Sequence, residues 1–235
     1  RKLSSMECHD LMCFIGQIVV VGGVRRSAMI SLSNLSDDRM RHAKSGQWWE
    51  TAPHRALANN SVSYSEKPDI ETFMREWTAL VESKSGERGI FNREASKKQA
   101  EKYGRRDPNY DFGTNPCSEI ILRPYQFCNL TEVVVRATDT YEDLKRKVKV
   151  ATILGTIQSS YTRFPYLRKV WQRNTEEERL LGVSLTGIMD NPLMTAVNSN
   201  LEKTLDNLRN VAVATNHEYA DLLGIPQSAA ITCVK

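Results

Sequence analysis

The sequence lacks the features that mark several specialised classes of protein. No apolar run approaches the roughly 18 residues that a membrane-spanning helix needs, and the longest candidate, residues 15–24, is interrupted by three glycines. There is no internal repeat, no low-complexity segment and no recognisable signal peptide. Hydrophobic residues make up 40% and charged residues 26% of the chain, which are ordinary values for a globular domain. These observations predict a cytoplasmic globular protein that is not embedded in a membrane.

A strong charge of one sign is also missing. The formal net charge is +4 over 235 residues, and the excess is spread thinly along the chain. Residues 105–106 and 145–149 are local basic clusters. A nucleic-acid interface would need a denser basic stripe with aromatic residues between the charges, so we expect solvated helix faces or loops and no nucleic-acid partner.

The cysteine content does not fit a secreted disulfide framework. The chain has five cysteines, Cys8, Cys13, Cys117, Cys128 and Cys233, and an odd number in a chain of this length favours a reducing compartment. A zinc site needs about four ligands at short spacings, and the four histidines lie far from the cysteine pair at 117 and 128. We therefore predict no metal site; that pair is either a redox thiol with a partner or two unconnected cysteines.

Hydrophobic periodicity and turn residues predict alternating strands and helices. The expected strands are residues 17–21, 28–32, 119–122, 129–136 and 229–234, with a glycine turn at 22–23 between the first two. The expected helices are residues 37–44, 69–83, 93–103, 141–161 and 201–223. This alternation predicts an α/β sheet or barrel with crossover helices.

The most informative stretch is residues 113–122, which contains Asn115-Pro116-Cys117-Ser118-Glu119. An extended backbone would place Asn115, Cys117 and Glu119 on one face, and a proline favours extended geometry in the residue before it. A thiol can be a reactive centre, a carboxylate can take a proton, and an amide can orient a hydroxyl. The plainer alternative is a buried cysteine in a loop, with Asn115 making a turn bond and Glu119 exposed.

The segment 115–130 resembles the active-site finger loop of ribonucleotide reductases, and is most similar to the adenosylcobalamin-dependent class II enzymes that reduce ribonucleoside triphosphates. Further segments that resemble this family follow in the same order along the chain: 20–28, 58–62, 89–93, 181–187 and 228–235. The resemblance implies an α/β fold, namely part of a ten-stranded α/β barrel with a central finger loop. Residues 1–235 would form a single fragment of that catalytic domain, with a specificity loop near 22–28 and the finger loop near 113–122.

The resemblance also implies a role for each residue of the finger loop. Cys117 would carry a transient thiyl radical that removes the 3′ hydrogen of the ribose. Glu119 would accept the proton of the 3′ hydroxyl, and Asn115 would hydrogen-bond the substrate hydroxyls. Cys128 would be one half of a redox-active dithiol that supplies two reducing equivalents.

Other residues would bind nucleotides. By the same resemblance, Gly23, Arg25 and Arg26 lie in the specificity loop, where guanidinium groups suit nucleotide contacts. Asn60 and Ser61 either face substrate or effector or form a turn. The implied ligands are a ribonucleoside di- or triphosphate substrate and a deoxynucleotide or ATP effector. The implied cofactor is adenosylcobalamin, and the implied reductant is of the thioredoxin type.

The sequence departs from the family pattern in several places. Cys8 and Cys13 lie too close to the specificity loop to match the second redox cysteine, and no complete cobalamin site is visible. The chain begins at Arg1 and ends on an apolar stretch that reads as a strand. We therefore expect an internal fragment that is inactive alone. Two alternatives stay open: a class I reductase that receives its radical from a partner subunit, and a non-catalytic nucleotide-binding module.

Overall fold

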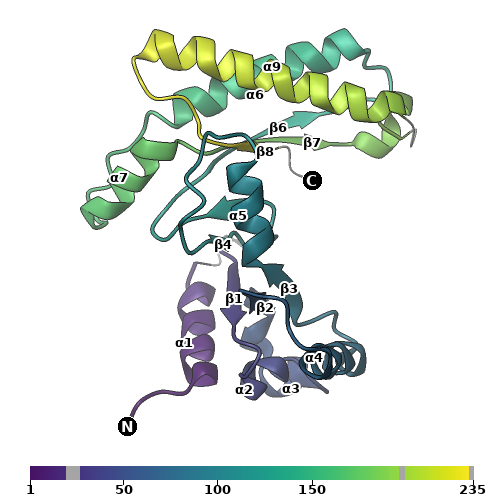
Figure 1. Ribbon diagram of the computed structural model, residues 1–235, viewed down its shortest axis with the longest axis vertical. Coiled ribbons are helices and arrows are strands. Elements are labelled where there is room, and N and C mark those ends of the chain that lie inside the picture. Colours follow the sequence, from purple (N-terminus) through teal and green to yellow (C-terminus); the bar gives the residue numbers. More distant parts are fainter. Residues whose placement is uncertain (20–26, 196–198, 233–235) are drawn as a thin grey trace. The chain divides into compact units, whose positions relative to one another are not determined.

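The computed structural model describes residues 1–19, 27–195 and 199–232, and the chain forms two compact units. Unit 1 comprises Arg1–Lys102 and Pro108–Arg123, and unit 2 comprises Tyr103–Asp107 and Pro124–Lys235. Each unit has its own three-stranded parallel sheet with helices (Figure 1), as parallel strands require helical or long crossovers. The predicted α/β class is therefore confirmed.

The sheet of unit 1 has the strand order β1-β2-β3. Its strands are β1 (Met29–Ser33), β2 (Ala58–Tyr64) and β3 (Gly89–Asn92). The central strand β2 is almost wholly buried, since both of its edges and both of its faces are covered. Its residue Asn59 lies opposite Ile30 of β1, so the direction of each β2 side chain is set by the pleat of a paired strand.

The helical elements of unit 1 are α1 (Ser5–Gln17), α2 (Asp38–Arg41), α3 (Trp48–Thr51), the 3₁₀ turn η1 (Pro53–Leu57), α4 (Ile70–Ser83) and α5 (Arg93–Glu101). Local sequence explains where the longer helices begin. Ser4 and Glu7 form a capping box at α1, and the Asp69 side chain accepts a hydrogen bond from the Thr72 amide at α4. Such caps satisfy amide groups that have no partner inside the helix.

One expected strand is wrong. Residues 17–21 are not a strand where they are described, because Gln17 ends α1 and Ile18 and Val19 lie in a turn. A short apolar run does not by itself separate a helix end from a strand, and the capping box upstream begins the helix. This helix end is exposed, since Ile18 is 81% exposed. The glycine turn expected at residues 22–23 lies outside the described residues.

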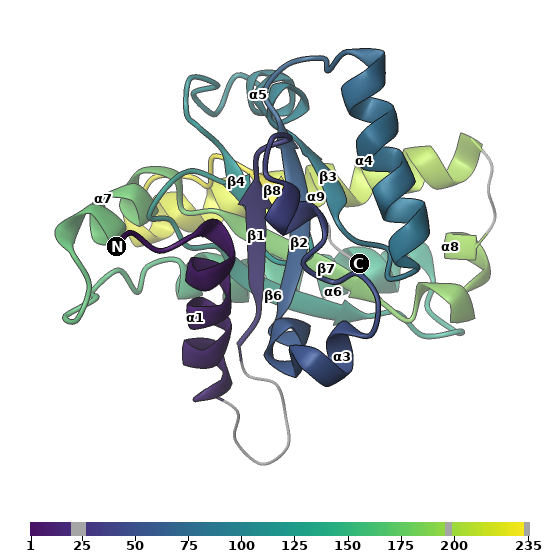
Figure 2. The same cartoon turned by 90° about the horizontal axis from the view of Figure 1, so that it is seen from below.

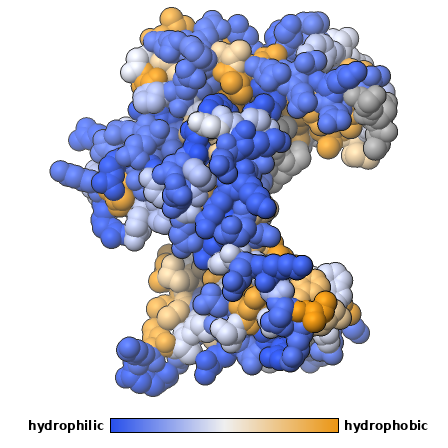
Figure 3. Space-filling model, viewed as in Figure 1, coloured by the Kyte–Doolittle hydropathy of each residue, from blue (hydrophilic) through white to orange (hydrophobic). Residues whose placement is uncertain are grey.

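The interior of unit 1 contains a buried cluster of charges. Glu76 on α4 accepts hydrogen bonds from Arg88 at 2.5 and 2.8 Å and from Arg41 at 2.9 Å. Burial alone would raise the pKa of Glu76, but the two guanidinium groups outweigh it and hold the pKa below its usual value. By contrast, the outer face of α4 exposes Ile70 and Trp77, in a region where Figure 3 shows hydrophobic side chains at the surface.

A short antiparallel hairpin completes unit 1. Its strands, β4 (Gly113–Thr114) and β5 (Ile121–Leu122), pair Gly113 with Leu122 and Thr114 with Ile121. The hairpin is anchored at its base, where Phe112 is fully buried and its carbonyl accepts a hydrogen bond from Arg93 at 3.1 Å. Residues 115–120 form the tip, which carries Cys117.

Unit 2 is a parallel sheet with the order β6-β7-β8 and two long helices over one face (Figures 1 and 2). Its elements are β6 (Asn129–Val134), α6 (Tyr141–Gln158), α7 (Lys169–Glu178), β7 (Leu181–Thr186), the 3₁₀ turn η2 (Ile188–Asp190), α8 (Pro192–Thr195), α9 (Ser199–Leu223) and β8 (Ile231–Thr232). The core between helices and sheet is apolar and includes Val133, Leu144, Val183 and Leu208.

The end of β7 explains one glycine of the family-like segment 181–187. Gly187 has a positive φ of 73°, and a Cβ placed there would lie 2.5 Å from the carbonyl oxygen of Val135. Any side chain would therefore push β7 away from the segment that follows β6.

Among the described residues, no helix combines the length and apolar character needed to span a bilayer.

Candidate functional site

Cys117 lies in a β-turn, and the extended backbone expected for residues 115–119 is wrong. The Ser118 amide donates to the Asn115 carbonyl at 3.0 Å, which makes Pro116 and Cys117 the two central residues of the turn. Ser118 follows in the left-handed region with φ 64°. Proline is favoured at the first central position of a turn, which explains why the chain reverses direction at Pro116 and Cys117.

The side chain of Asn115 closes the tip of the hairpin. Its Oδ1 accepts a hydrogen bond from the Ile120 amide at 3.0 Å, while Thr114 Oγ1 donates to the Ile120 carbonyl at 2.9 Å. This is the turn bond that the plainer sequence interpretation predicted for Asn115. Its amide oxygen therefore has a structural partner, which does not test the substrate contact expected for this residue.

The two reactive groups of the finger loop differ in exposure. Cys117 is exposed, whereas Glu119 is half-buried and its Oε2 is a buried oxygen without a hydrogen-bond partner among the described residues. A buried carboxylate oxygen without a partner is costly, and it is able to accept a proton or a hydrogen bond from a ligand. Chemically, the turn presents a thiol and, two residues on, a carboxylate with spare acceptor capacity.

The strand β2 separates the residues expected at the site. Asn60 Oδ1 lies 2.9 Å from His9 Nε2 on α1, so this side chain faces the helix. Its neighbour Asn59 points the other way and donates from Nδ2 to the Pro116 carbonyl at 2.6 Å. Alternation along the strand places Ser61 on the face of Asn59. Sequence reasoning named Asn60 and Ser61 but missed Asn59, which only the two-residue period of a strand could have singled out.

Cys128 belongs to unit 2, where α7 holds the segment before it. Asn174 Nδ2 donates to the Pro124 carbonyl at 2.8 Å, and the rings of Phe127 and Trp171 have centroids 4.8 Å apart. Both contacts come from one face of α7, since residues three apart share a helix face. The half-buried Cys128 follows directly after these anchors.

A buried ion pair reinforces the same segment. Arg106 donates to Glu178 at 2.9 Å and to Gln126 Oε1 at 3.0 Å. The expectation that residues 105–106 form a solvated basic cluster is therefore wrong for Arg106, which is buried.

The other basic cluster behaves as expected. The charged side chains of residues 145–149 lie on α6 and form ion pairs with carboxylates: Lys145–Glu142, Arg146–Asp143, Lys147–Asp139 and Lys149–Glu218. These side chains are partly or largely exposed, as a solvated helix face requires.

The remaining expected site residues cannot be placed. Gly23, Arg25 and Arg26 lie outside the described residues. Within the described ranges, no group of three or more histidine, cysteine, aspartate or glutamate side chains is arranged to hold a metal ion. The two thiol-bearing segments belong to different units, Cys117 to unit 1 and Cys128 to unit 2.

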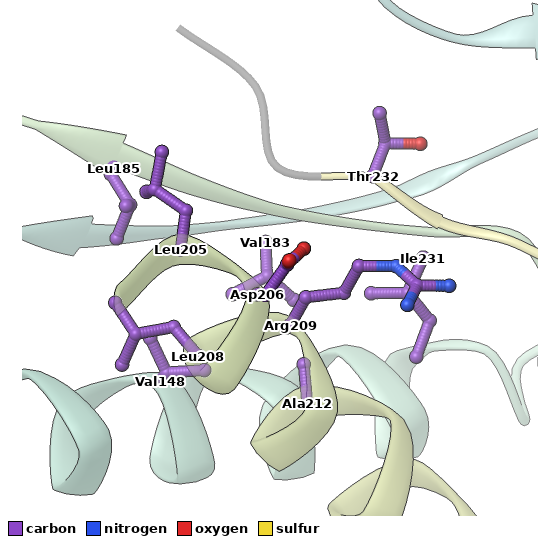
Figure 4. A pocket seen from close by; sticks show the side chains of 10 residues that line it. All are labelled: Val148, Val183, Leu185, Leu205, Asp206, Leu208, Arg209, Ala212, Ile231 and Thr232. Carbon is purple, nitrogen blue, oxygen red and sulfur yellow. The ribbon is translucent and has the colours of Figure 1, made fainter. Parts of the chain in front are cut away.

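Unit 2 also contains an apolar cavity of about 310 Å³ between α9 and the sheet (Figure 4). Its walls include Val183 and Leu208, and the side chains of Asp206, Arg209 and Thr232 are its polar members. None of the residues expected to be catalytic lines it. The cavity is continuous with the apolar core, and no cysteine is among its described lining residues.

Comparison with known proteins adds a family to this geometry. No model of a protein family matches the sequence. An adenosylcobalamin-dependent ribonucleoside-triphosphate reductase of Lacticaseibacillus paracasei is 30% identical over 269 aligned residues, which cover 100% of this chain and 34% of that protein. Proteins of the same name from Levilactobacillus brevis and Lactobacillus gasseri are 31% and 32% identical, over 81% of this chain and 25% of each protein.

The chain belongs to the ribonucleotide reductase family. A crystal structure of a B12-dependent, class II ribonucleotide reductase superposes with a TM-score of 0.73, covering 98% of this chain and 35% of that chain at 23% identity. This likeness shows that the fold is that of the reductase. The chain spans about a third of the length of the curated reductases it matches, 34% for the L. paracasei protein.

Proposed function

We propose that this chain forms part of the catalytic barrel of a cytoplasmic, adenosylcobalamin-dependent ribonucleoside-triphosphate reductase that makes deoxyribonucleotides. The observation that carries the proposal is the match of the whole chain to curated proteins of that one name. The two parallel sheets would both contribute to a ten-stranded α/β barrel. Residues 1–235 would then belong to one domain, with the finger loop at 113–122.

The proposed chemistry is divided among the residues of the hairpin and Cys128. Cys117 would act as a thiyl radical that removes the 3′ hydrogen of the substrate ribose. Glu119 would take the proton of the 3′ hydroxyl, a role supported by its buried oxygen without a partner. Asn115 would hold the substrate hydroxyls. Cys128 would give up electrons as one half of a dithiol, which a thioredoxin-type reductant would restore.

Ligand binding would involve residues beyond the hairpin. Gly23, Arg25 and Arg26 would contact the substrate base or a deoxynucleotide or ATP effector, and Ser61, on the strand face that carries Asn59, would face the substrate. Asn60 contacts His9 through Oδ1, and its buried Nδ2, which has no hydrogen-bond partner among the described residues, would be the atom that binds a ligand. The substrate would be a ribonucleoside tri- or diphosphate.

We propose that adenosylcobalamin is bound partly by residues outside this chain. Adenosylcobalamin would supply the radical when it is bound. Neither Cys117 nor Glu119 lines the apolar cavity of unit 2, and these two side chains alone do not form a cobalamin site. We therefore place the cofactor against other parts of a complete reductase, and expect the 235-residue chain alone to be inactive.

The decisive test is Cys117→Ser in a full-length reductase that contains this chain. We expect deoxynucleotide formation to be abolished while the circular dichroism spectrum and nucleotide binding are retained, because serine cannot carry the radical. Cys8→Ser is the matched control, since Cys8 is an exposed thiol outside the hairpin and should leave turnover unchanged. Normal activity of Cys117→Ser would refute the radical assignment.

Two further outcomes separate the alternatives. Turnover that requires adenosylcobalamin would support class II chemistry, whereas turnover that requires a radical-bearing partner subunit would indicate class I. Tight nucleotide binding that depends on neither Cys117 nor Cys128, without turnover, would indicate a non-catalytic nucleotide-binding module. Mixing the chain with separately expressed flanking parts of a reductase tests complementation, and no product in any mixture would count against it.

A further inference from the structure

We propose that Asn59 is a positioning residue that holds the Pro116–Cys117 peptide in one of two orientations and so aims the Cys117 thiol. The consequence for catalysis rests on the proposed function, but the geometric claim does not. The Asn59 side chain reaches from the central strand of the sheet in unit 1 to the carbonyl of Pro116, at 2.6 Å.

The backbone of the turn shows which of the two orientations the Pro116–Cys117 peptide has. Type I and type II turns place their outer residues alike and differ mainly in the orientation of the central peptide, here Pro116–Cys117. The second central residue has φ near −90° in type I and near +80° in type II. Cys117 is not among the residues with positive φ, so the turn has the type I orientation. Proline at the first central position suits both types, and Pro116 therefore does not choose between them.

The carbonyl that Asn59 contacts changes direction when the turn changes type. The Pro116 oxygen belongs to the peptide that reverses between the two turn types, so a flip would carry it away from Asn59 Nδ2. A neutral hydrogen bond of this kind favours one state by about two- to tenfold. Because the flip changes φ of Cys117, it also redirects the bond from its Cα to its Cβ, and with it the sulfur.

Asn59 is held in place because it lies on the central strand of the sheet. Its backbone is paired with Ile30 in the sheet, and its neighbours Ala58 and Asn60 are buried. Asn60 is held in turn by His9 on α1, at 2.9 Å. A side chain on such a strand has a fixed origin and direction, whereas the hydrogen bonds within the hairpin tip described above do not involve the Pro116–Cys117 peptide. Asn59 thus transfers the rigidity of the sheet to the turn.

The test replaces the donor without changing its size. Asn59→Asp puts a carboxylate against the Pro116 carbonyl, and Asn59→Ala removes the group. In the 235-residue chain, the nuclear Overhauser effect between the Pro116 Hα and the Cys117 amide proton reports the flip, because these protons lie close together only in the type II orientation. We expect this signal to be weak in the original chain and to strengthen two- to tenfold in both variants.

Acid provides a rescue that a merely structural role would not show. A protonated aspartic acid is again a donor, so Asn59→Asp should return to the type I signal as the pH falls through the pKa of the new carboxyl. Asn59→Ala should not respond. Asn174→Asp is the matched control, since Asn174 donates to the carbonyl of Pro124 at 2.8 Å and its loss should leave the Cys117 signal unchanged.

The outcomes separate this inference from the function beneath it. An unchanged signal in folded Asn59→Asp and Asn59→Ala refutes the positioning role. Should neither variant fold, the original chain still decides, because a strong signal there between the Pro116 Hα and the Cys117 amide proton, as a type II turn gives, would refute it. In a full-length reductase we expect Asn59→Asp to lower kcat roughly two- to tenfold with little change in KM. If the turn flips but Cys117→Ser remains active, only the proposed function fails.

Discussion

The two units of this chain build their interiors from different materials. Among the described residues, the apolar cluster of unit 2 lies between α6, α9 and the sheet and has ten buried members. The apolar cluster of unit 1 has three buried members there, and the same unit buries the charged group of Arg41, Glu76 and Arg88. Breaking a buried ion pair strands an uncompensated charge, whereas truncating an apolar side chain leaves a cavity. The core of unit 1 should therefore respond to changes of charge and pH. The α6–α9 core of unit 2, to which the buried pair of Arg106 and Glu178 does not belong, should respond to changes of volume.

The same contrast extends to the two cysteine-bearing segments. The turn with Cys117 is held by hydrogen bonds, including the one from Asn59. The segment before Cys128 is held by packing of Phe127 on Trp171 together with the buried pair of Arg106 and Glu178. A hydrogen bond to a peptide fixes an orientation, while packing mainly fixes a position. The thiol proposed to attack the substrate is thus supported differently from the thiol proposed to supply electrons.

The largest effect is expected from Glu76→Ala in unit 1. Removing the carboxylate leaves Arg41 and Arg88 buried without their shared partner, which should cost about 3–5 kcal/mol of unfolding free energy. Hydrogen exchange resolved by peptide would show loss of protection in β2 and α4. Glu71→Ala on the same helix is the control, because its side chain is 81% exposed and the change should stay within about 0.5 kcal/mol. Equal effects of the two substitutions would remove the basis of the comparison.

An apolar truncation in unit 2 should come next. Leu144 is fully buried on α6, and Leu144→Ala should cost about 2–5 kcal/mol through lost burial and the cavity left behind. Leu154→Ala is the control on the same helix, since Leu154 is 57% exposed. Chemical denaturation with hydrogen exchange would assign the loss to unit 2. A larger loss in unit 1 than in unit 2 would contradict independent cores.

The smallest effect is a difference in acid response. The folded pKa of Glu76 lies below its ordinary value of 4.5, so its ionised form stabilises unit 1 at all pH values above about 4.5. That stabilisation is lost as the pH falls through the lowered folded pKa. It amounts to about 1.4 kcal/mol for each unit by which the folded pKa lies below the unfolded pKa. Glu76→Gln should be less stable at neutral pH but show a shallower decline between pH 5 and 3. An unchanged slope would rule out Glu76 as a source of the acid sensitivity.

Local signals account for the parts of the fold that sequence reasoning predicted. The helices at α4, α5, α6 and α9 were predicted to within a few residues, because apolar periodicity and caps such as Asp69 depend only on neighbours in sequence. The strand at β6 was found through its run of valines. The prediction of a strand at residues 17–21 is wrong because a short apolar run has no periodicity of its own. The capping box of Ser4 and Glu7 instead begins a helix that continues to Gln17.

The candidate site also combines properties set by the sequence with properties set by the tertiary structure. The sequence by itself determined which chemical groups the hairpin carries, a thiol at Cys117 and a carboxylate at Glu119, since these are properties of the residues in order. Only the tertiary structure decided how they are presented. The turn around Pro116, the direction of Asn60 toward His9 and the reach of Asn59 to the turn depend on strands that meet across long separations in the chain. No local pattern encodes those contacts, because a hydrogen bond between residues 59 and 116 exists only once the sheet and the hairpin have both formed.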